Sequence, residues 1–352
     1  MDKVGIITLG GHFNYGNRLQ NYASDSVWRG VGYEPTSLYL ADRFNLYRSL
    51  KGKVRAVFFG PVANPEDGMS EERLKAFGRF DQHMQRCSLA NAEKNLVDSY
   101  RFFSVGSDQV WNPFFIAHNE EWFFLTFAKR EQRIALSPSI GLDSLSHQHK
   151  KIVAKGVQGF PRLSVREQRG AELIKECSGI DAEVICDPTL VLSAEEWRAV
   201  SDGRCTPSGP YIFTYLLGGI GSEASAVLEK VTDHGRIPVV PLTDRQKPGE
   251  PDAGPAEFID LIDNATHVVT DSFHAAVFSS ILKTPLTIVH REGGASMFSR
   301  LEQLSGMLGI EEKVYGSPGY DLSRAGDYEG VYEAIARERA HFIDYLKGCL
   351  NG

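Results

Sequence analysis

The chain has 352 residues, a formal net charge of -7, 42% hydrophobic residues and 24% charged residues. This length exceeds what one hydrophobic core usually organises, so we expect two domains. The balance of apolar and charged residues excludes a disordered or fibrous chain. The acidic charge, spread without a basic face, argues against a nucleic-acid partner.

The N-terminus has neither the length nor the cleavage pattern of a signal peptide, and no apolar run approaches the roughly 20 residues of a membrane span. We therefore expect a cytoplasmic protein. In residues 43–59, basic and apolar positions alternate. This pattern fits either peripheral contact with the inner face of the membrane or an ordinary surface segment. The five cysteines lack metal-type spacing, so we expect free thiols and no metal site.

In the first half of the chain, short apolar runs alternate with helical patterns. Strands are predicted at residues 4–9, 101–105, 133–136, 163–166 and 183–186. Helices are predicted at residues 17–29, 70–86 and 146–157, and an irregular surface segment at 39–70. Strands that alternate with helices are typical of a parallel sheet covered on both faces.

A second series follows a break rich in glycine and proline at residues 201–210. Its predicted strands are 211–216, 238–241, 267–270 and 286–289, and its predicted helices are 222–233, 255–265 and 274–282. We therefore predict an α/β fold with two Rossmann-like domains whose parallel sheets face a central cleft. The predicted domains span residues 1–200 and 210–326, and a last helix within 327–352 is predicted to pack back on the first domain.

Polar side chains follow the strand predicted at 267–270. Asp271, Ser272 and His274 come directly after it, at the start of a helix. The carboxyl ends of parallel strands and the amides of the following helices meet at the ligand-binding edge of such sheets. A small anion is the ligand we expect there, although an ordinary helix N-cap explains Asp271 and Ser272 equally well.

Other strand ends carry chemistry of the same kind. Asp108 and Gln109 follow one strand, and Arg166 closes another, where a guanidinium can bind a carboxylate or phosphate through paired hydrogen bonds. Capping, burial of area or a surface ion pair remains an alternative in each case. Asp187 precedes a proline and is expected to set a turn. The sequence has no HExxH, GxSxG or Cys/His cluster, which gives no support to a metalloprotease or serine hydrolase.

Five motifs in order resemble the polysaccharide pyruvyl transferase family over residues 4–310. They read NYGN at 14–17, GSDQVWN at 106–112, SVRE at 164–167, CDPTL at 186–190 and TDSFH at 270–274. The resemblance implies the GT-B architecture of two-domain glycosyltransferases. It also implies transfer of the pyruvyl group of phosphoenolpyruvate onto two sugar hydroxyls as a cyclic ketal, without cofactor or metal. The implied acceptor is a nucleotide- or lipid-linked saccharide.

The resemblance also suggests roles for individual residues. The expected catalytic residues are His274, Asp108 and Glu167. The expected donor-binding residues are Arg166, Ser272, His274, Arg291 and Arg300. The expected acceptor-binding residues are Asn14, Tyr15, Asn17, Gln20, Gln109 and Trp111.

Two other functions remain open at this stage. One is a glycosyltransferase of the same architecture that uses a nucleotide sugar, because a fold does not fix its chemistry. The other is a non-catalytic sugar-binding protein. Competition by nucleotides against phosphoenolpyruvate separates the first from a pyruvyl transferase, and a biological role that survives replacement of His274 or Arg166 indicates the second.

Overall fold

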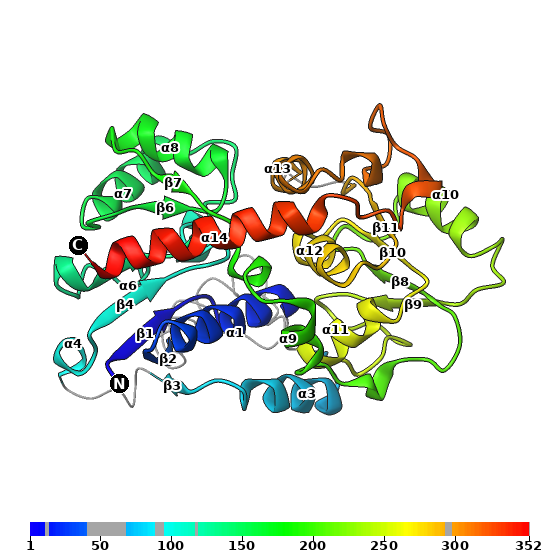
Figure 1. Cartoon of the computed structure of the whole chain (residues 1–352), viewed down its shortest axis with the longest axis horizontal. Helices are drawn as coiled ribbons and strands as arrows, with labels where there is room; N and C mark the ends of the chain where they lie inside the picture. Colours follow the sequence, from blue (N-terminus) through cyan, green and yellow to red (C-terminus); the bar gives the residue numbers. More distant parts are fainter. Residues whose placement is uncertain (11–13, 41–67, 89–94, 117–118, 293–297, 352) are drawn as a thin grey trace, which may run out of the picture.

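The computed structural model describes residues 1–10, 14–40, 68–88, 95–116, 119–292 and 298–351. These residues form two α/β lobes that lie side by side, each with a parallel sheet covered by helices (Figure 1). The predicted α/β fold is confirmed. The basic stretch at 43–59 and most of the segment predicted as irregular lie outside the described residues.

The N-terminal lobe contains a five-stranded parallel sheet in the order β3-β2-β1-β4-β5. Its strands are β1 (Lys3–Ile7), β2 (Glu34–Tyr39), β3 (Arg86–Ser88), β4 (Phe102–Val105) and β5 (Arg133–Ala135). A separate pair of parallel strands is formed by β6 (Ser164–Val165) and β7 (Glu183–Val184). The helices of this part of the chain are α1 (Tyr15–Gly30), α3 (Glu71–Asp81), α4 (Leu96–Ser99), α5 (Pro113–Ile116), α6 (Glu120–Phe123), α7 (His147–Val157) and α8 (Gln168–Ser178).

The C-terminal lobe contains a four-stranded parallel sheet in the order β11-β10-β8-β9. Its strands are β8 (Ile212–Tyr215), β9 (Val239–Leu242), β10 (His267–Thr270) and β11 (Leu286–Ile288). The remaining helices are α9 (Ala194–Arg198), α10 (Ser222–Val231), α11 (Pro255–Asp263), α12 (Phe273–Leu282), α13 (Ser299–Leu308) and α14 (Val331–Leu350). Strand β10 and helix α12 are mostly apolar and almost entirely buried, which places the turn between them at the centre of the lobe.

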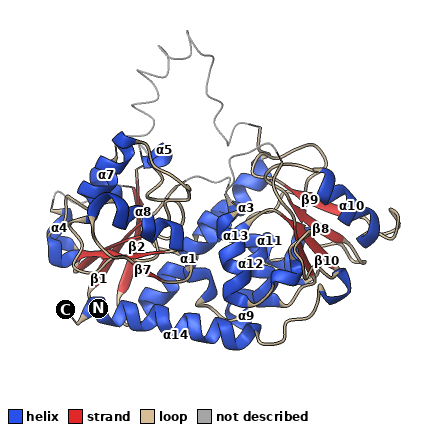
Figure 2. Ribbon diagram, turned by 90° about the horizontal axis from the view of Figure 1, so that it is seen from above, coloured by secondary structure: helices blue, strands red, loops and turns tan. Residues whose placement is uncertain are grey.

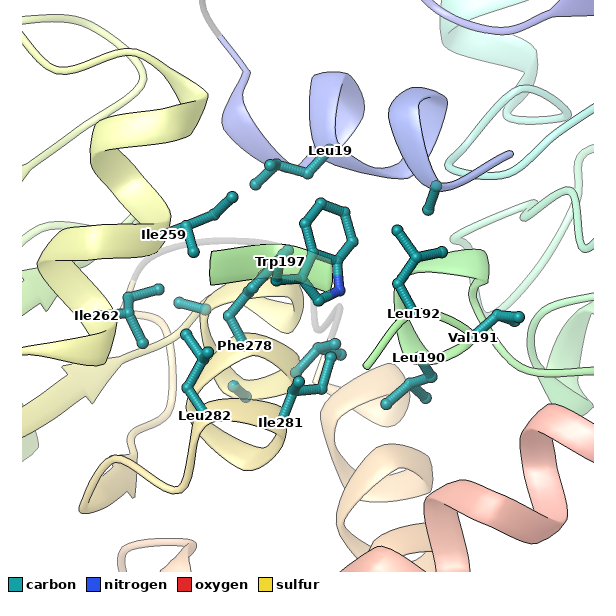
Figure 3. Packing of buried hydrophobic residues seen from close by; sticks show 14 of the residues in the cluster. Leu19, Leu190, Val191, Leu192, Trp197, Ile259, Ile262, Phe278, Ile281 and Leu282 are labelled. Atoms are coloured by element: carbon teal, nitrogen blue, oxygen red, sulfur yellow. The ribbon is translucent and has the colours of Figure 1, made fainter. Parts of the chain in front are cut away.

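One hydrophobic core continues from the first lobe into the second. Trp197 of α9 lies at its centre, fully buried, and its indole Nε1 donates a hydrogen bond to the Thr189 carbonyl at 3.2 Å. Leu19 of α1 approaches it from one lobe, and Ile259 and Phe278 approach it from the other (Figure 3). An apolar interface of this kind favours a fixed arrangement of the lobes, because separating them exposes buried surface to water.

Two helices cross the boundary between the lobes. The long α14 runs along both (Figure 2), and near its end the Tyr345 hydroxyl donates a hydrogen bond to the Ala135 carbonyl of β5 at 3.0 Å. Helix α3 belongs to the first 200 residues but packs against α11 of the C-terminal lobe, where Arg79 pairs with Glu257 at 2.7 Å.

Strands β2 and β3 were absent from the sequence prediction. The β2 segment opens with Glu34, Pro35 and Thr36, so it has no apolar run, yet its middle residues are buried between β1 and β3. The helix predicted at 70–86 ends at Asp81, and β3 follows it. In the described part of the chain, no helix has both the length and the apolar character needed to cross a bilayer.

Candidate functional site

The candidate site is a cavity of about 190 Å³ lined by both lobes. Each sheet has a switch point, where the connections that follow two neighbouring strands run in opposite directions. These neighbours are β1 and β4 in the N-terminal sheet and β8 and β10 in the C-terminal sheet. Crevices at such switch points are where open α/β sheets bind ligands. The described residues that line the cavity include Asn14, Gly16, Asp108, Gln109, Tyr215, Leu217, Asp271, Ser272, Phe273, His274, His290, Arg291, Phe298, Arg300 and Leu301.

Three helices begin at this cavity. Asn14, Ser272 and Phe298 occupy the N-cap positions of α1, α12 and α13, and all three line the cavity. Of the three, only Asn14 makes a capping bond, which its side chain accepts from the Asn17 amide. The first amides of a helix have no partner inside it, and the helix dipole is positive at that end. The Ser272 hydroxyl makes no capping bond to its own helix, so it is available to a ligand. Features of this kind suit the binding of an anion.

Two arginines add positive charge to the same wall. Arg291 donates a hydrogen bond from Nε to Asp271 at 3.2 Å, and Asp271 also accepts bonds from the Leu217 and Gly218 amides at 2.7 and 2.8 Å. Asp271 therefore holds the loop after β8 and orients Arg291. Burial lowers the pKa of Arg300 to about 10, and the nearby charge of Arg166 adds to this effect. Arg300 is still a cation at neutral pH.

His274 is the buried imidazole of the cavity. Its Nε2 lies 3.7 Å from Asp187 Oδ2 and has no hydrogen-bond partner among the described residues. Its Nδ1 side lies against Gly16 of α1, where a Cβ atom would come within 2.0 Å of Nδ1. Only glycine at position 16 leaves room for the ring, so the glycine of the NYGN motif and the histidine of the TDSFH motif form one structural unit.

Asp187 organises the groups behind His274. It is buried and accepts hydrogen bonds from the Ser107 hydroxyl at 2.9 Å, Arg166 Nη1 at 2.8 Å and the Thr189 hydroxyl at 2.7 Å. Burial by itself would raise the pKa of Asp187, but the nearby His274 and the charge and hydrogen bond of Arg166 outweigh it and hold the pKa well below its usual range. Asp187 is thus an anion that holds the Arg166 guanidinium and lies beside the His274 ring.

Arg166 was predicted to clamp the donor, and the structure places it elsewhere. Its guanidinium lies behind the Phe273 ring, 4.6 Å from the ring centroid, and is surrounded by Asp187 at 2.8 Å, Glu167 at 3.9 Å and Asp108 at 4.0 Å. It does not belong to the described lining of the main cavity but borders a smaller one of about 30 Å³. The prediction that Arg166 reaches into the cavity is therefore corrected: its guanidinium lies behind the described lining and faces three carboxylates, of which Asp108 also lines the cavity.

Glu167 was predicted as a catalytic base, and it too lies behind the cavity. Its Oε1 accepts hydrogen bonds from the Ile140 and Gly141 amides at 2.8 and 3.0 Å. The side chain is buried and does not line the main cavity in the described structure. These bonds fix the loop after β5, so Glu167 has a structural role, and Asp108 is the predicted base that lines the cavity.

Four of the predicted acceptor residues are buried away from the cavity. The Tyr15 ring stacks on Phe258 and its hydroxyl bonds to the Ala253 carbonyl, while Trp111 stacks on Phe124. Asn17 and Gln20 point inward to hold the loop after β4, because Gln20 accepts a bond from the Ser107 amide at 2.8 Å and Asn17 donates one to Asp108 at 3.4 Å. The cavity is lined by the other two, Asn14 and Gln109.

Sequence reasoning missed two groups of this site. Asp187 was interpreted as a turn residue, although its place at a strand end beside Cys186 was the same signal that singled out Asp271. Tyr215 lines the cavity and donates a hydrogen bond to Asp244. Asp244 lies in a loop without a motif, and no sequence pattern joins it to Tyr215.

The fold and the site define an α/β protein with a cavity lined by residues from both of its parallel-sheet lobes. A family model described as polysaccharide pyruvyl transferase matches residues 14–290, which is most of the chain, and the chain belongs to that family. The match includes all five motifs of the sequence analysis. The family indicates a transferase of polysaccharide biosynthesis.

Solved structures with a similar course of the chain are distant in sequence. The UDP-GlcNAc 2-epimerase from Neisseria meningitidis bound to UDP-GlcNAc is 10% identical with a TM-score of 0.46, and the match covers 99% of this chain and 100% of that one. An alpha-glucosyltransferase in complex with UDP and a 13-mer DNA is 10% identical with a TM-score of 0.49, over 98% of this chain and 95% of that one. No curated protein matches the chain significantly.

Proposed function

We propose that this protein transfers the pyruvyl group of phosphoenolpyruvate to two hydroxyls of a sugar, forms a cyclic ketal and releases phosphate. The observation that carries the proposal is the convergence of three helix N-termini, Arg291 and Arg300 on one cavity that also contains His274. Phosphoenolpyruvate bears a phosphate and a carboxylate, so it needs two anion-binding subsites close together.

The size of the cavity supports a small donor. Its volume is about 190 Å³, whereas pockets for drug-sized ligands measure roughly 300–1,000 Å³. Phosphoenolpyruvate is much smaller than a nucleotide sugar. The described cavity therefore favours the pyruvyl donor over the nucleotide-sugar alternative.

The reaction requires a proton at the methylene carbon of the donor. We assign this proton to His274, whose Nε2 lies 3.7 Å from the buried carboxylate of Asp187. Protonation leaves a cationic carbon, one sugar hydroxyl attacks it, and a C–O bond forms. Asp108, which lines the cavity from the N-terminal lobe, accepts the hydroxyl proton in this assignment.

The phosphate then leaves as its C–O bond breaks, and a second sugar hydroxyl attacks the same carbon. Arg291 and Arg300 stabilise the charge on the departing phosphate. The two hydroxyl protons balance the two protons that the products gain, one on the new methyl group and one on the phosphate. The amides of Asn14 and Gln109 are the groups assigned to the sugar hydroxyls.

The test is phosphate release from phosphoenolpyruvate with a panel of free, nucleotide-linked and lipid-linked sugars, followed by mass spectrometry of the product. Phosphate release that depends on an acceptor, with a pyruvyl ketal in the product, is the expected result. Binding of UDP that competes with phosphoenolpyruvate, together with transfer from a nucleotide sugar, would contradict the proposal and favour a glycosyltransferase.

A further inference from the structure

Tyr215 occupies a fixed position at the cavity. It ends β8 at the switch point of the C-terminal sheet and lines the cavity, and its hydroxyl donates a hydrogen bond to Asp244 Oδ1. The Tyr15 and Phe258 rings contact its ring edge-to-face, with centroids at 5.5 and 5.2 Å. Such packing leaves the hydroxyl little freedom to move.

The loop that carries Asp244 is fixed as well. Its neighbour Thr243 bonds to Glu250 through both its amide, at 3.2 Å, and its hydroxyl, at 2.7 Å. Glu250 in turn pairs at 3.5 Å with Arg73, a buried residue of α3. These partners hold the loop after β9 in place, so the pairing of Asp244 with Tyr215 is a built feature of the fold.

The surroundings of the pair suit proton transfer near neutral pH. Burial raises the pKa of Asp244 to about 6; the Tyr215 hydrogen bond and the charges of Arg291 and Arg73 oppose this rise, while the charge of Asp108 adds to it. Burial, together with the charge of Asp244, raises the pKa of Tyr215 well above its usual value. Tyr215 therefore stays protonated, and the carboxyl group of Asp244 changes charge in the range where a base is most effective.

We propose that Tyr215 is a second proton-accepting group of the site and that Asp244 is the positioning residue that receives the proton through it. The inference rests on the proposed function. As a sugar hydroxyl forms its bond to the pyruvyl carbon, its proton passes to the Tyr215 oxygen while the phenol proton of Tyr215 passes to Asp244. Asp244 ends protonated, Tyr215 is unchanged, and the proton leaves to solvent before the next turnover.

Ketal formation gives this pair a specific place in the reaction. Two hydroxyls must lose protons in two separate attacks, and they approach the same carbon from different directions. Asp108 lies at the end of β4 in the N-terminal lobe, and Tyr215 lies at the end of β8 in the C-terminal lobe. In this arrangement Asp108 accepts the proton of one hydroxyl, and Tyr215 accepts the proton of the other.

The test is the pH profile of acceptor-dependent phosphate release in Tyr215→Phe and Asp244→Asn. The wild type is expected to lose kcat/KM as the pH falls through about 6, because Asp244 must be ionised to act as a base. Each variant should lose tenfold or more of kcat above pH 7, on the scale of general-base catalysis of about 10²–10⁴. The fall in kcat/KM near pH 6, which we call the acid limb of the profile, should be missing from both variants. The double variant should be no slower than either single variant.

Matched controls separate this role from packing. Tyr211→Phe removes the hydroxyl of another buried tyrosine, which bonds to the Leu261 carbonyl at 2.8 Å, and Asp260→Asn changes another carboxylate that accepts a side-chain hydroxyl bond. Both should keep the wild-type profile. If Tyr215→Phe fails to fold, the profile of Asp244→Asn decides.

The outcomes distinguish the two proposals. A wild-type enzyme that releases phosphate, with an acid limb that persists in Tyr215→Phe and Asp244→Asn, overturns this inference and leaves the proposed function intact. A wild-type enzyme that forms no ketal with any acceptor overturns the proposed function and, with it, this inference.

Discussion

The wall of the cavity, which includes Ser272 and His274, and the buried layer behind it, which includes Asp187 and Arg166, contain similar residue types. The hydrogen bonds of these residues differ between the two regions. In the layer, polar groups bond to each other: Arg166 and Ser107 both donate to Asp187, and Gln20 holds the Ser107 amide. In the wall, the Ser272 hydroxyl makes no capping bond, and in the described structure His274 Nε2 has no hydrogen-bond partner. Unpaired buried atoms occur in both regions, because Arg166 Nε and Glu167 Oε2 also have no hydrogen-bond partner among the described residues. The wall differs in that its side chains line the cavity, where a ligand can reach them.

This difference predicts separate consequences for the two regions. A substitution in the wall removes contacts that form only with substrate, so turnover or substrate binding should fall while the fold stays stable. A substitution in the layer leaves a buried partner unsatisfied, so the fold itself should lose stability.

The largest effect on turnover is expected for His274→Ala. Loss of the proton donor should lower kcat by about 10²–10⁴, with a thermal midpoint close to that of the wild type. Steady-state phosphate release and a thermal melt measure the two quantities. His341→Ala is the control, because His341 pairs with Glu183 on the surface at 2.9 Å. Wild-type turnover in His274→Ala would remove this histidine from the chemistry.

Arg166→Gln should instead act on the fold. It leaves the carboxylates of Asp108, Glu167 and Asp187 buried together without their shared cation. Breaking a buried ionic group in this way costs about 3–5 kcal/mol of unfolding free energy. Denaturant titration measures the loss. A variant as stable as the wild type, but with weakened donor binding, would restore the clamp that the sequence predicted.

Gly16→Ala tests the contact between the two regions. The added methyl would overlap the His274 ring, so the imidazole must shift. A misplacement of about 1 Å can cost about 10²-fold in rate. Gly10→Ala is the control from the segment that precedes α1, because a Cβ at Gly10 meets no atom of the described residues within 4 Å. Equal activity of the two variants would show that His274 does not depend on this glycine for its position.

Arg300→Gln should weaken donor binding with little effect on stability. Burial and the neighbouring charge of Arg166 both disfavour the cation at position 300, so the unliganded protein gains little from it. An anionic donor bound beside Arg300 would stabilise the cation and offset the cost of its burial. We expect about a tenfold rise in the Kd of phosphoenolpyruvate, on the scale of one charge-assisted hydrogen bond. Calorimetry measures the change, and a Kd equal to that of the wild type would place the donor elsewhere.

The sequence predicted the larger part of the fold, and several of the residues that it singled out line the cavity, for identifiable physical reasons. Apolar runs such as 267–270 mark buried strands wherever the run is unbroken, but β2 is buried by its neighbours in spite of Glu34 and Pro35 at its start. The rule that ligands bind at strand ends located Asp108, Ser272 and His274 correctly at the cavity.

The same rule does not show which way a side chain points. Asn14 and Tyr15 are adjacent, and only Asn14 faces the cavity, because the Tyr15 ring completes an aromatic cluster with Phe258. Trp111 is buried for the same reason, against Phe124. Contacts of this kind join elements far apart in the chain, and local pattern carries no information about them.

The smallest predicted effect separates the pH dependence of folding from that of the site. Burial, together with the charge of Lys313, lowers the pKa of His267 from 6.5 to about 4. As the pH falls from 6.5, the unfolded chain binds the proton first, so the free energy of unfolding decreases by about 1.4 kcal/mol per pH unit until the pH reaches the folded pKa. Above pH 6.5 this group contributes no slope.

His267→Gln retains a polar partner for Thr287, which lies 2.9 Å from His267 Nε2, and removes the titrating group. Denaturant titrations between pH 4 and 7 should show a flatter stability profile than that of the wild type. The acid limb of turnover should remain near pH 6, because it depends on Asp244 in a different part of the lobe. If the limb moved with the stability profile, loss of the fold rather than a titrating base would explain the pH dependence of the reaction.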